Sequence, residues 1–200
     1  MPHVKSRREA YSEATRAALL EEATALFAER GYARTSLEDV ASASRVTRGA
    51  VYHHFASKQA LFEAVLDAQE ARATEQIATA AAAADAWEAA MLALDAFLRQ
   101  CCDPTYGRLV WLEGPAALGW HRWRECEEKY AYGLVERFVC DLIDAGYLEA
   151  KAVDSLIRFS FWMLGGAGLT LAEAPETDKP RLREEWGYLI RRTISGLRIK

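Results

Sequence analysis

The 200-residue chain contains little proline, little cysteine and no long uncharged run. Five prolines beside abundant alanine, leucine and glutamate favour helices. The 51 % hydrophobic content argues against a disordered chain. Four cysteines without CxxC spacing make no disulfide framework, so the thiols are expected to be reduced: Cys101, Cys102, Cys126 and Cys140. Composition therefore predicts a folded, all-α protein.

The sequence also lacks a segment that would direct it into or through a membrane. The longest uncharged stretch, residues 159–172, has fourteen residues and is too short to span a bilayer as a helix. The first twenty residues contain no apolar segment of the kind found in secretory signals. We therefore expect a cytoplasmic protein with no membrane partner.

An overall excess of positive charge is missing too, because the net charge is −4. Residues 1–60 nevertheless carry nine Lys or Arg against seven Asp or Glu, whereas the remainder carries sixteen against twenty-two. A modestly basic head on an acidic body is expected of a DNA-binding protein with a separate non-DNA body. Residues 1–10 form a polar arm with Lys5, Arg7 and Arg8, which is predicted either to be disordered or to touch phosphates of bound DNA.

The stretch from Thr35 to Lys58 has the pattern of two short helices, a tight turn between them and the start of a longer helix. Thr35 with Glu38 three residues later predicts a capping box at the first short helix. Thr47 is predicted to cap the second, which begins at Arg48. This is the pattern of a helix-turn-helix.

The second short helix has two distinct faces. Val51 and Phe55 are four residues apart and are predicted to anchor it inward. Arg48, Tyr52 and His53 are then left on the outside, which is the geometry that places a helix N-terminus in a major groove of DNA.

Residues 21–65, EEATALFAERGYARTSLEDVASASRVTRGAVYHHFASKQALFEAV, resemble the DNA-binding head of TetR-family transcriptional regulators. The matching pieces are the end of the first helix, LFAERGY, the threonine-led second helix, the VYHHF core and the SKQALF entry to the fourth helix. One departure concerns the turn, where Ser44 and Arg45 stand in place of the Ala-Gly of many members. Either this turn closes differently, or Arg45 accepts a left-handed backbone and reaches a phosphate.

The DNA-contacting residues follow from the outward face and from the resemblance. Arg48 is the predicted reader of guanine, because its planar fork matches the O6/N7 edge. Thr47 and Tyr52 are predicted to hold phosphate, and the resemblance implies the same role for Lys58. The full predicted surface comprises Thr35, Ser36, Arg45, Thr47, Arg48, Gly49, Ala50, Tyr52, His53 and Lys58.

The sequence predicts a three-helix helix-turn-helix domain with its basic arm at residues 1–56, and a larger helical ligand-binding and dimerisation domain at residues 57–200, with about nine helices in all. Cap and stop signals separate the helices. The predicted helices besides those of the helix-turn-helix span residues 12–30, residues from 57 past 77, residues from 85, 103–113, 120–144, 152–174 and 180–197.

Large aromatic and sulfur-containing side chains gather in the helices of the predicted body. Core packing explains any single one of them, but together they exceed what a body of this size needs. The resemblance implies an inducer cavity here, and a small hydrophobic or aromatic effector fits better than a highly charged one. The candidate lining residues are Phe97, Trp111, Trp120, Trp123, Tyr130, Phe159, Trp162 and Met163.

The helix predicted at residues 152–174 is apolar nearly all round, so it requires burial on two sides. One side belongs to its own core, and we assign the other to a second copy of the chain. Together with the apolar stripe of the last helix, this predicts a four-helix seam in a homodimer. The residues assigned to the interface are Phe161, Leu164, Gly165, Gly168, Trp186, Leu189, Ile190 and Thr193.

The sequence thus predicts a homodimeric, ligand-responsive transcriptional repressor that leaves a palindromic double-stranded DNA operator when an effector binds. Two alternatives stay open: a DNA-binding protein without an effector, constitutive or architectural, and a regulator that senses oxidants through Cys101 and Cys102. No catalytic arrangement or phosphate loop stands out, so neither an enzyme nor a cofactor is predicted. His121, Glu125 and Glu128 share a helical face, which we interpret as solvated rather than as a metal site.

Overall fold

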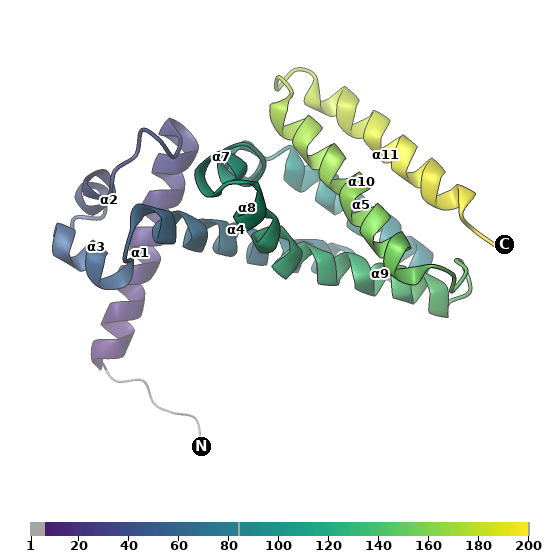
Figure 1. Cartoon of the computed structure of the whole chain (residues 1–200), viewed down its shortest axis with the longest axis horizontal. Helices are drawn as coiled ribbons and strands as arrows, with labels where there is room; N and C mark the ends of the chain where they lie inside the picture. Colours follow the sequence, from purple (N-terminus) through teal and green to yellow (C-terminus); the bar gives the residue numbers. More distant parts are fainter. Residues whose placement is uncertain (1–6, 84, 200) are drawn as a thin grey trace. The chain divides into compact units, whose positions relative to one another are not determined.

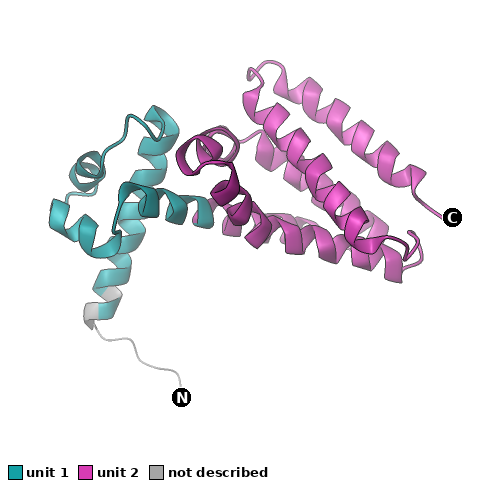
Figure 2. Ribbon diagram, in the orientation of Figure 1, with its two compact units in different colours: residues 1–67 teal, residues 68–200 magenta. Residues whose placement is uncertain are grey.

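The computed structural model describes residues 7–83 and 85–199, and in these ranges the chain forms nine helical rods (Figure 1). The predicted all-α fold class is therefore confirmed. Within the same ranges the only extended pairing is a single bridge between Leu148 and Arg198. Of the predicted basic arm, Lys5 and the side chains of Arg7 and Arg8 lie outside the described residues. The chain divides into two compact units, unit 1 (Met1–Asp67) and unit 2 (Ala68–Lys200) (Figure 2).

Unit 1 contains three helices and the first turns of a fourth: α1 (Arg7–Arg30), α2 (Leu37–Ala43), α3 (Arg48–His54) and α4 (Lys58–Ala80). The sequence predicts that this helix begins near Ser12, but α1 begins at Arg7. The negative charge of Glu9 in its first turn interacts favourably with the positive end of the helix dipole. Gly31 ends the helix as predicted, with a φ of 85° that suits glycine.

The core of unit 1 is built on aromatic packing between α1 and α4. Phe27 and Phe62 are fully buried, and their rings meet edge to face with centroids 5.1 Å apart. Tyr32 adds a second edge contact to Phe62 at 5.0 Å. Val51 of α3 is also fully buried, so the second short helix is anchored as its spacing predicts.

Unit 2 contains the rest of α4 and the remaining rods: α5 (Ala86–Cys101), α6 (Pro104–Tyr106) continuing into η1 (Gly107–Glu113) and α7 (Gly114–Leu118), α8 (Trp120–Glu127) continuing into η2 (Glu128–Tyr132) and α9 (Gly133–Asp144), α10 (Val153–Glu173) and α11 (Lys179–Gly196). Helix α10 is central, because it packs against α5, η1, α9 and α11. Asp85 and Asp103 cap α5 and α6, each accepting a hydrogen bond from the backbone N–H three residues on.

The helix predicted to end near residues 113–115 continues to Leu118, so this boundary prediction is wrong. The reason is the wide π-helical turn of η1, in which the N–H of Gly114 bonds to the carbonyl of Leu109, five residues back. Pro115 has no N–H to donate at this point. The carbonyl of Val110 accepts instead from the indole Nε1 of Trp123, at 2.8 Å, so the rod passes the proline without an orphaned acceptor there.

Helix α10 lies close to η1 because Gly168 has no side chain. A Cβ at Gly168 would come within 2.4 Å of the Trp111 ring, whereas Trp111 is now buried against it. Helix α10 is also the one helix among the described residues that is long and apolar enough to cross a membrane by length and composition, a test that core helices of soluble proteins also pass. In this structure its buried side chains pack within unit 2.

We expect Gly168→Ala to lower the free energy of unfolding by about 1–3 kcal/mol, because the added methyl group overpacks the Trp111 site. Gly133→Ala is the matched control. Its Cβ would meet nothing within 4 Å, so the change should raise stability by up to about 1 kcal/mol through helix propensity alone. Urea unfolding of both variants checks this, and equal effects would contradict the close approach.

Candidate nucleic-acid interface and ligand cavity

The first helix of the helix-turn-helix is capped one residue later than the sequence predicts. Ser36, not Thr35, is the N-cap: its Oγ accepts from the Asp39 N–H at 3.1 Å, and the Asp39 carboxylate accepts from the Ser36 N–H at 2.8 Å. The Ser36 hydroxyl also donates to the Asp39 carboxylate, at 2.6 Å, and this bond together with the Ser36 N–H holds the pKa of Asp39 below its ordinary value. The predicted Thr35–Glu38 box is therefore wrong, although its type and its region are right.

Thr35 has an internal role instead. Its side chain is buried, and its hydroxyl donates to the backbone carbonyl of Gly31 at 3.0 Å. The side-chain contact with DNA predicted for Thr35 does not fit this geometry. Ser36 is half-buried and already engaged with Asp39, so its hydroxyl is held in the cap.

The turn between α2 and α3 resolves the alternative left by the sequence. Arg45 adopts a left-handed backbone with a φ of 55°, which costs about 1–2 kcal/mol in a residue with a Cβ. Its exposed side chain is free to extend into solvent. Thr47 caps α3 as predicted, since its Oγ1 accepts from the Ala50 N–H at 3.2 Å.

Helix α3 presents a cationic and aromatic face to solvent. The Arg48 guanidinium lies 2.7 Å from the Glu38 carboxylate, donates to the Tyr52 hydroxyl at 3.3 Å and sits over the Tyr52 ring. The hydrogen bond with Tyr52 and the charge of Glu38 raise the pKa of Arg48 further. Gly49 and His53 on the same short helix are also exposed. The outward face predicted for this helix is thus present.

An open groove lies beside this face, formed by the N-termini of α2 and α4 and by α3. Lys58 and Arg34 line it together with Arg48. The Lys58 ammonium lies 4.2 Å from the Tyr32 ring centroid and 3.4 Å from the Ala33 carbonyl, and partial burial lowers its pKa. Arg34, which the sequence analysis did not single out, adds a third cation to the groove.

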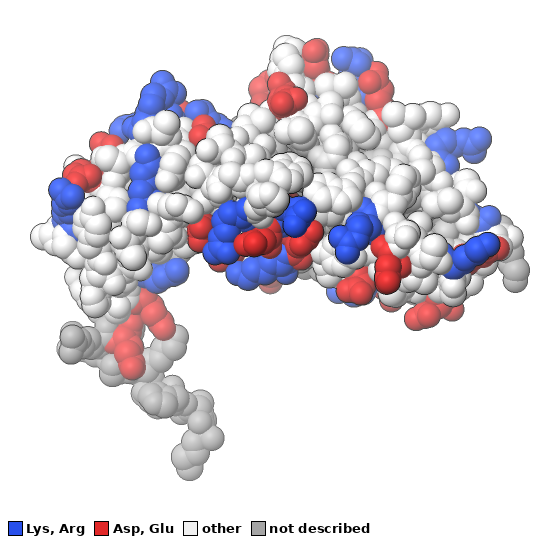
Figure 3. Space-filling model, viewed as in Figure 1, with Lys and Arg blue, Asp and Glu red and all other residues white. Residues whose placement is uncertain are grey.

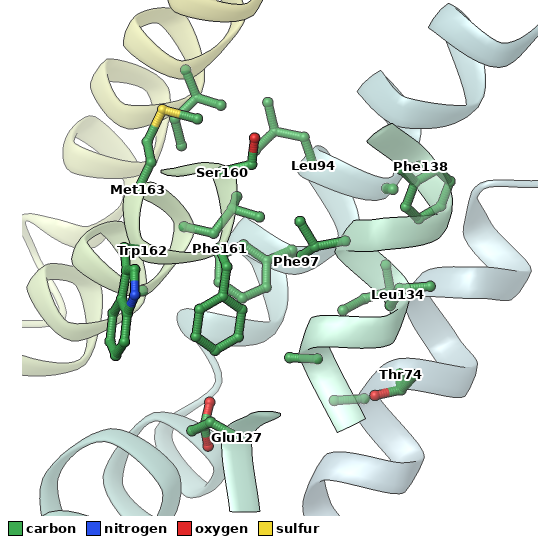
Figure 4. Close-up of a pocket in the computed structure, with 18 of the residues that line it drawn as sticks. Thr74, Leu94, Phe97, Glu127, Leu134, Phe138, Ser160, Phe161, Trp162 and Met163 are labelled. Carbon is green, nitrogen blue, oxygen red and sulfur yellow. The ribbon is translucent and has the colours of Figure 1, made fainter. Parts of the chain in front are cut away.

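Unit 2 encloses a cavity of about 130 Å³ between α4, α5, α8, α9 and α10 (Figure 4). Its walls are mostly apolar, and Phe97, Trp111, Trp123, Trp162 and Met163 line it as the sequence predicts. The polar or ionisable side chains among the lining residues are Glu70, Thr74, Tyr106, Arg124, Glu127 and Ser160.

Three of the residues proposed as lining lie elsewhere. Trp120 is half exposed and stacks on Trp162 from outside the cavity, with ring centroids 5.9 Å apart. Phe159 is 49 % exposed, and Tyr130 lies beside Lys129 with no place in the cavity wall. Aromatic content alone did not show which helical face turns inward.

A buried hydrogen bond joins two cavity residues that the sequence analysis missed. The Tyr106 hydroxyl donates to the Glu70 carboxylate at 2.7 Å, and both side chains are buried. Burial raises the pKa of Glu70 to about 7, partly offset by the Tyr106 hydrogen bond. A signal for Glu70 does exist in the sequence, because it falls four residues after Leu66 on the buried stripe of α4.

Glu127 is the second carboxyl group of the cavity. It is 5 % exposed, and burial followed by repulsion from Glu70 raises its pKa well above the ordinary value. In Figure 4 its carboxylate points toward Phe161. Glu127 lies four residues after Trp123 and so shares its buried face.

The structure does not favour a reactive thiol at Cys101 or Cys102. Cys101 is fully buried, and burial raises its pKa well above the ordinary value; burial also raises that of Cys102. Thiols of this kind are poor nucleophiles. Within residues 7–83 and 85–199 no three His, Cys, Asp or Glu side chains cluster as metal ligands would, and His121 and Glu125 are exposed.

The predicted interface residues divide into inward and outward sets. Phe161, Gly168 and Ile190 are buried within the single chain, so they do not offer the surface contacts predicted for them. Phe161 and Ile190 line the cavity, and Gly168 packs against the Trp111 ring. Leu189 and Thr193 are exposed, whereas Leu164, Gly165 and Trp186 are partly buried. The exposed large hydrophobic residues of α10 and α11 are Phe159, Trp162, Leu169, Tyr188 and Leu189.

The buried carboxyl groups predict a pH dependence of stability. Because the pKa of Glu70 rises from 4.5 unfolded to about 7 folded, the folded state holds its proton more tightly. This stabilisation is complete below the unfolded pKa and is lost as the pH rises through about 7, by about 3 kcal/mol at most for Glu70. Glu70→Gln still accepts the hydrogen bond from Tyr106 but cannot titrate, so its free energy of unfolding should fall less as the pH rises.

Urea unfolding between about pH 5 and pH 8 measures this difference. Glu125→Gln, at an exposed position on the same helix as Glu127, should behave as the wild type. Parallel pH profiles for the wild type and Glu70→Gln would show that the buried carboxyl does not titrate in this range.

Two family models match the chain. Residues 19–65 match the family described as bacterial regulatory proteins, tetR family, and residues 87–197 match the tetracyclin repressor-like, C-terminal domain. The second match alone covers more than half of the chain. The two matches fall on the helix-turn-helix and on the helical body that holds the cavity.

Individual relatives agree with these matches. A TetR-family transcriptional regulator from Pectobacterium atrosepticum superposes with a TM-score of 0.82 at 28 % identity, covering 98 % of this chain and 99 % of that one. The transposon Tn10 TetC protein of Escherichia coli is 27 % identical over 76 % of this chain and 77 % of that protein. An HTH-type transcriptional repressor of Mycobacterium tuberculosis is 53 % identical over 28 % of this chain and 29 % of that protein. The chain belongs to the TetR family of helix-turn-helix transcriptional regulators.

Proposed function

We propose that this regulator is a homodimeric repressor that leaves a palindromic DNA operator when a small ligand enters the cavity of unit 2. We assign DNA binding to residues 1–56, and ligand binding and dimerisation to residues 57–200. The observation that carries the proposal is the exposed pair of Arg48 and Tyr52 on α3, anchored from behind by the buried Val51. A protein of this kind acts in the cytoplasm, where the operator is.

Direct reading of DNA falls to the N-terminal half of α3. Arg48 is permanently charged, 63 % exposed in its side chain and able to meet the O6 and N7 atoms of guanine with its two terminal nitrogens. Gly49 and Ala50 add no bulk beside it, so the helix can approach base edges closely. His53 is exposed one turn after Gly49.

Phosphate contacts are supplied by the ends of the neighbouring elements. Arg45, Arg34 and Lys58 surround α3, and the N-termini of α2 and α4 face the same groove. Helix N-termini and cations both favour an anion there. The left-handed backbone of Arg45 is accounted for if its side chain reaches a phosphate of bound DNA.

The outer faces of α10 and α11 are the proposed dimer surface. Figure 3 shows a largely uncharged surface over α10, and Tyr188 and Leu189 of α11 are 64 % and 54 % exposed. Exposed apolar side chains gathered in this way mark a protein interface. A two-fold pair would present two α3 helices to successive major grooves, as a palindromic operator requires.

The cavity supports the ligand-responsive part of the proposal. Its volume is close to that of the roughly 150 Å³ apolar cavity known to bind benzene. RolR, a protein of the same fold with a TM-score of 0.69 and 17 % identity, has a solved structure in complex with resorcinol. A ligand of one ring is therefore the size class we propose for this chain.

Ligand binding must favour one conformation over another if it is to release DNA. Helix α4 is the element suited to carry the change, because it contributes Lys58 to the groove and Glu70 to the cavity wall. The alternative of a regulator without an effector leaves this cavity without a role. The alternative of a thiol switch is disfavoured by the complete burial of Cys101.

We expect Arg48→Ala to weaken binding to the preferred operator by about 1–3 kcal/mol and to relax the preference at one base pair, because one guanine contact is lost. Selection of bound sequences from random DNA identifies that operator first, and a palindrome is expected. Titration of labelled operator at fixed salt then measures the change.

Arg99→Ala is the matched control for the loss of one positive charge. Arg99 is exposed on α5, outside the helix-turn-helix, and its replacement should leave the base preference unchanged. An unaltered operator affinity and base preference in Arg48→Ala would remove the assignment of α3 as the reading helix.

We expect Leu189→Arg to shift the protein from dimer to monomer, since it places a charge at the centre of the proposed apolar interface. Leu92→Arg on α5 is the control, because Leu92 is also exposed but lies outside α10 and α11. Sedimentation equilibrium measures both. A dimer that survives Leu189→Arg, or that Leu92→Arg disrupts equally, would place the interface elsewhere.

A further inference from the structure

The cavity of unit 2 contains a carboxyl group that its own chain does not satisfy. Glu127 lines the cavity and is 5 % exposed, yet among the described residues its side chain has no hydrogen-bond or ion-pair partner. Burying such a group without a partner costs several kcal/mol in general. A buried polar group of this kind is retained at a cost that a ligand can offset.

A second carboxyl group reinforces the first. Glu70 lines the same cavity and has one neutral donor, the Tyr106 hydroxyl at 2.7 Å. Glu127 and Glu70 line the same cavity, and repulsion from Glu70, after burial, contributes to the raised pKa of Glu127. The two carboxyl groups therefore form one acidic end of an otherwise apolar cavity.

Among the residues that the structure describes, no basic side chain pairs with this acidic end. Arg124 is the one basic residue among the described residues that line the cavity, and its Nε lies 3.6 Å from a carboxylate oxygen of Glu128. A cation that pairs with this end of the cavity would therefore come from a ligand and not from the described residues.

The rest of the wall suits the apolar part of such a cation. Phe161 and Trp162 of α10 contribute aromatic rings 5.2 Å apart, and Figure 4 shows the Phe161 ring directed toward the Glu127 carboxylate. Aromatic faces attract cations by their quadrupoles, most strongly where water is excluded. The volume of about 130 Å³ admits a molecule of one ring.

We propose that this cavity binds a one-ring hydrophobic amine in its protonated form, with the ammonium group between Glu127 and Glu70 and the ring against Phe161 and Trp162. The proposal rests on the ligand-responsive function above and narrows its ligand class. It adds one positive charge to the expectation from the sequence, which favoured a small hydrophobic or aromatic effector over a highly charged one. Ammonium N–H groups supply the donors that Glu127 lacks.

A matched series of small probes tests the proposal on the wild-type protein without DNA. Benzylamine, benzyl alcohol and benzoate have similar size and differ in charge, and calorimetric titration near pH 8 measures their affinities. We expect benzylamine to bind at least about tenfold more tightly than benzyl alcohol, and benzoate to bind least. Equal or tighter binding of benzyl alcohol would overturn the proposal, and tighter binding of benzoate would point to Arg124 as the anchor.

Two variants locate the charge recognition. Glu127→Gln keeps the shape of the side chain and should abolish the preference for benzylamine over benzyl alcohol, whereas the exposed Glu125→Gln should keep it. Glu70→Gln should reduce the preference for benzylamine over benzyl alcohol. It provides a second test of charge recognition if Glu127→Gln fails to fold. A preference that survives both cavity substitutions would overturn the assignment.

Dependence on pH gives an independent reading. The titratable and charged groups that line the cavity are Glu70, Glu127, Tyr106 and Arg124. Burial keeps Tyr106 neutral by raising its pKa. Deprotonation of Glu70 as the pH rises through about 7 should strengthen benzylamine binding and leave benzyl alcohol binding flat. A flat benzylamine profile would contradict the proposal.

Release of operator DNA separates this inference from the proposed function. Benzylamine that binds through Glu127 but leaves operator binding unchanged would support the ligand class and count against effector-driven release. Benzyl alcohol that releases the operator at lower concentration than benzylamine would support release and overturn the ligand class.

Discussion

The burial of Val51 on the interior side of α3 is the constraint on which the proposed DNA-contacting surface depends. Val51 is fully buried, so the helix has one rotational setting, and in that setting Arg48 and Tyr52 are exposed. The core beneath is built from the edge contacts of Phe27 and Phe62. A short helix of this length would not be stable alone, so its orientation comes from packing and not from propensity. The recognition surface is thus an indirect product of the apolar core.

The arrangement of unit 1 could be predicted from the sequence because its side chains follow strong local rules. The four-residue spacing of Val51 and Phe55 predicts the inward face of α3, and Thr47 predicts its start. The cap of α2 was placed one residue early, because Thr35 and Ser36 are both good caps and only the tertiary bonds of the Thr35 hydroxyl to the α1 terminus decide between them. The departure at Arg45 was visible, but its left-handed backbone could be established only from the structure.

The cavity could be predicted only in part, for a different reason. Large aromatic residues indicate where the interior is rich in rings, but Trp120 and Phe159 show that a ring can equally cover the outside. Charged residues are assigned to the surface by default, because burial is costly for them. Glu70 and Glu127 break this rule at once, and a single sequence gives only their position on an apolar stripe as a hint. Exceptions of this type concentrate where a protein binds something.

The ion pair between Arg48 and Glu38 has a consequence for discrimination between DNA sequences. In the absence of DNA the guanidinium already has a carboxylate partner at 2.7 Å. A duplex bound in the proposed way would replace that partner and bring its phosphates near the Glu38 charge. A guanine opposite Arg48 would replace the lost ion pair with hydrogen bonds to its O6 and N7 atoms. Another base would offer no such bonds, and the Glu38 carboxylate would still repel the phosphates. Glu38 would then act as a built-in competitor that penalises the wrong site more than the right one, so selectivity would come from repulsion as well as from attraction.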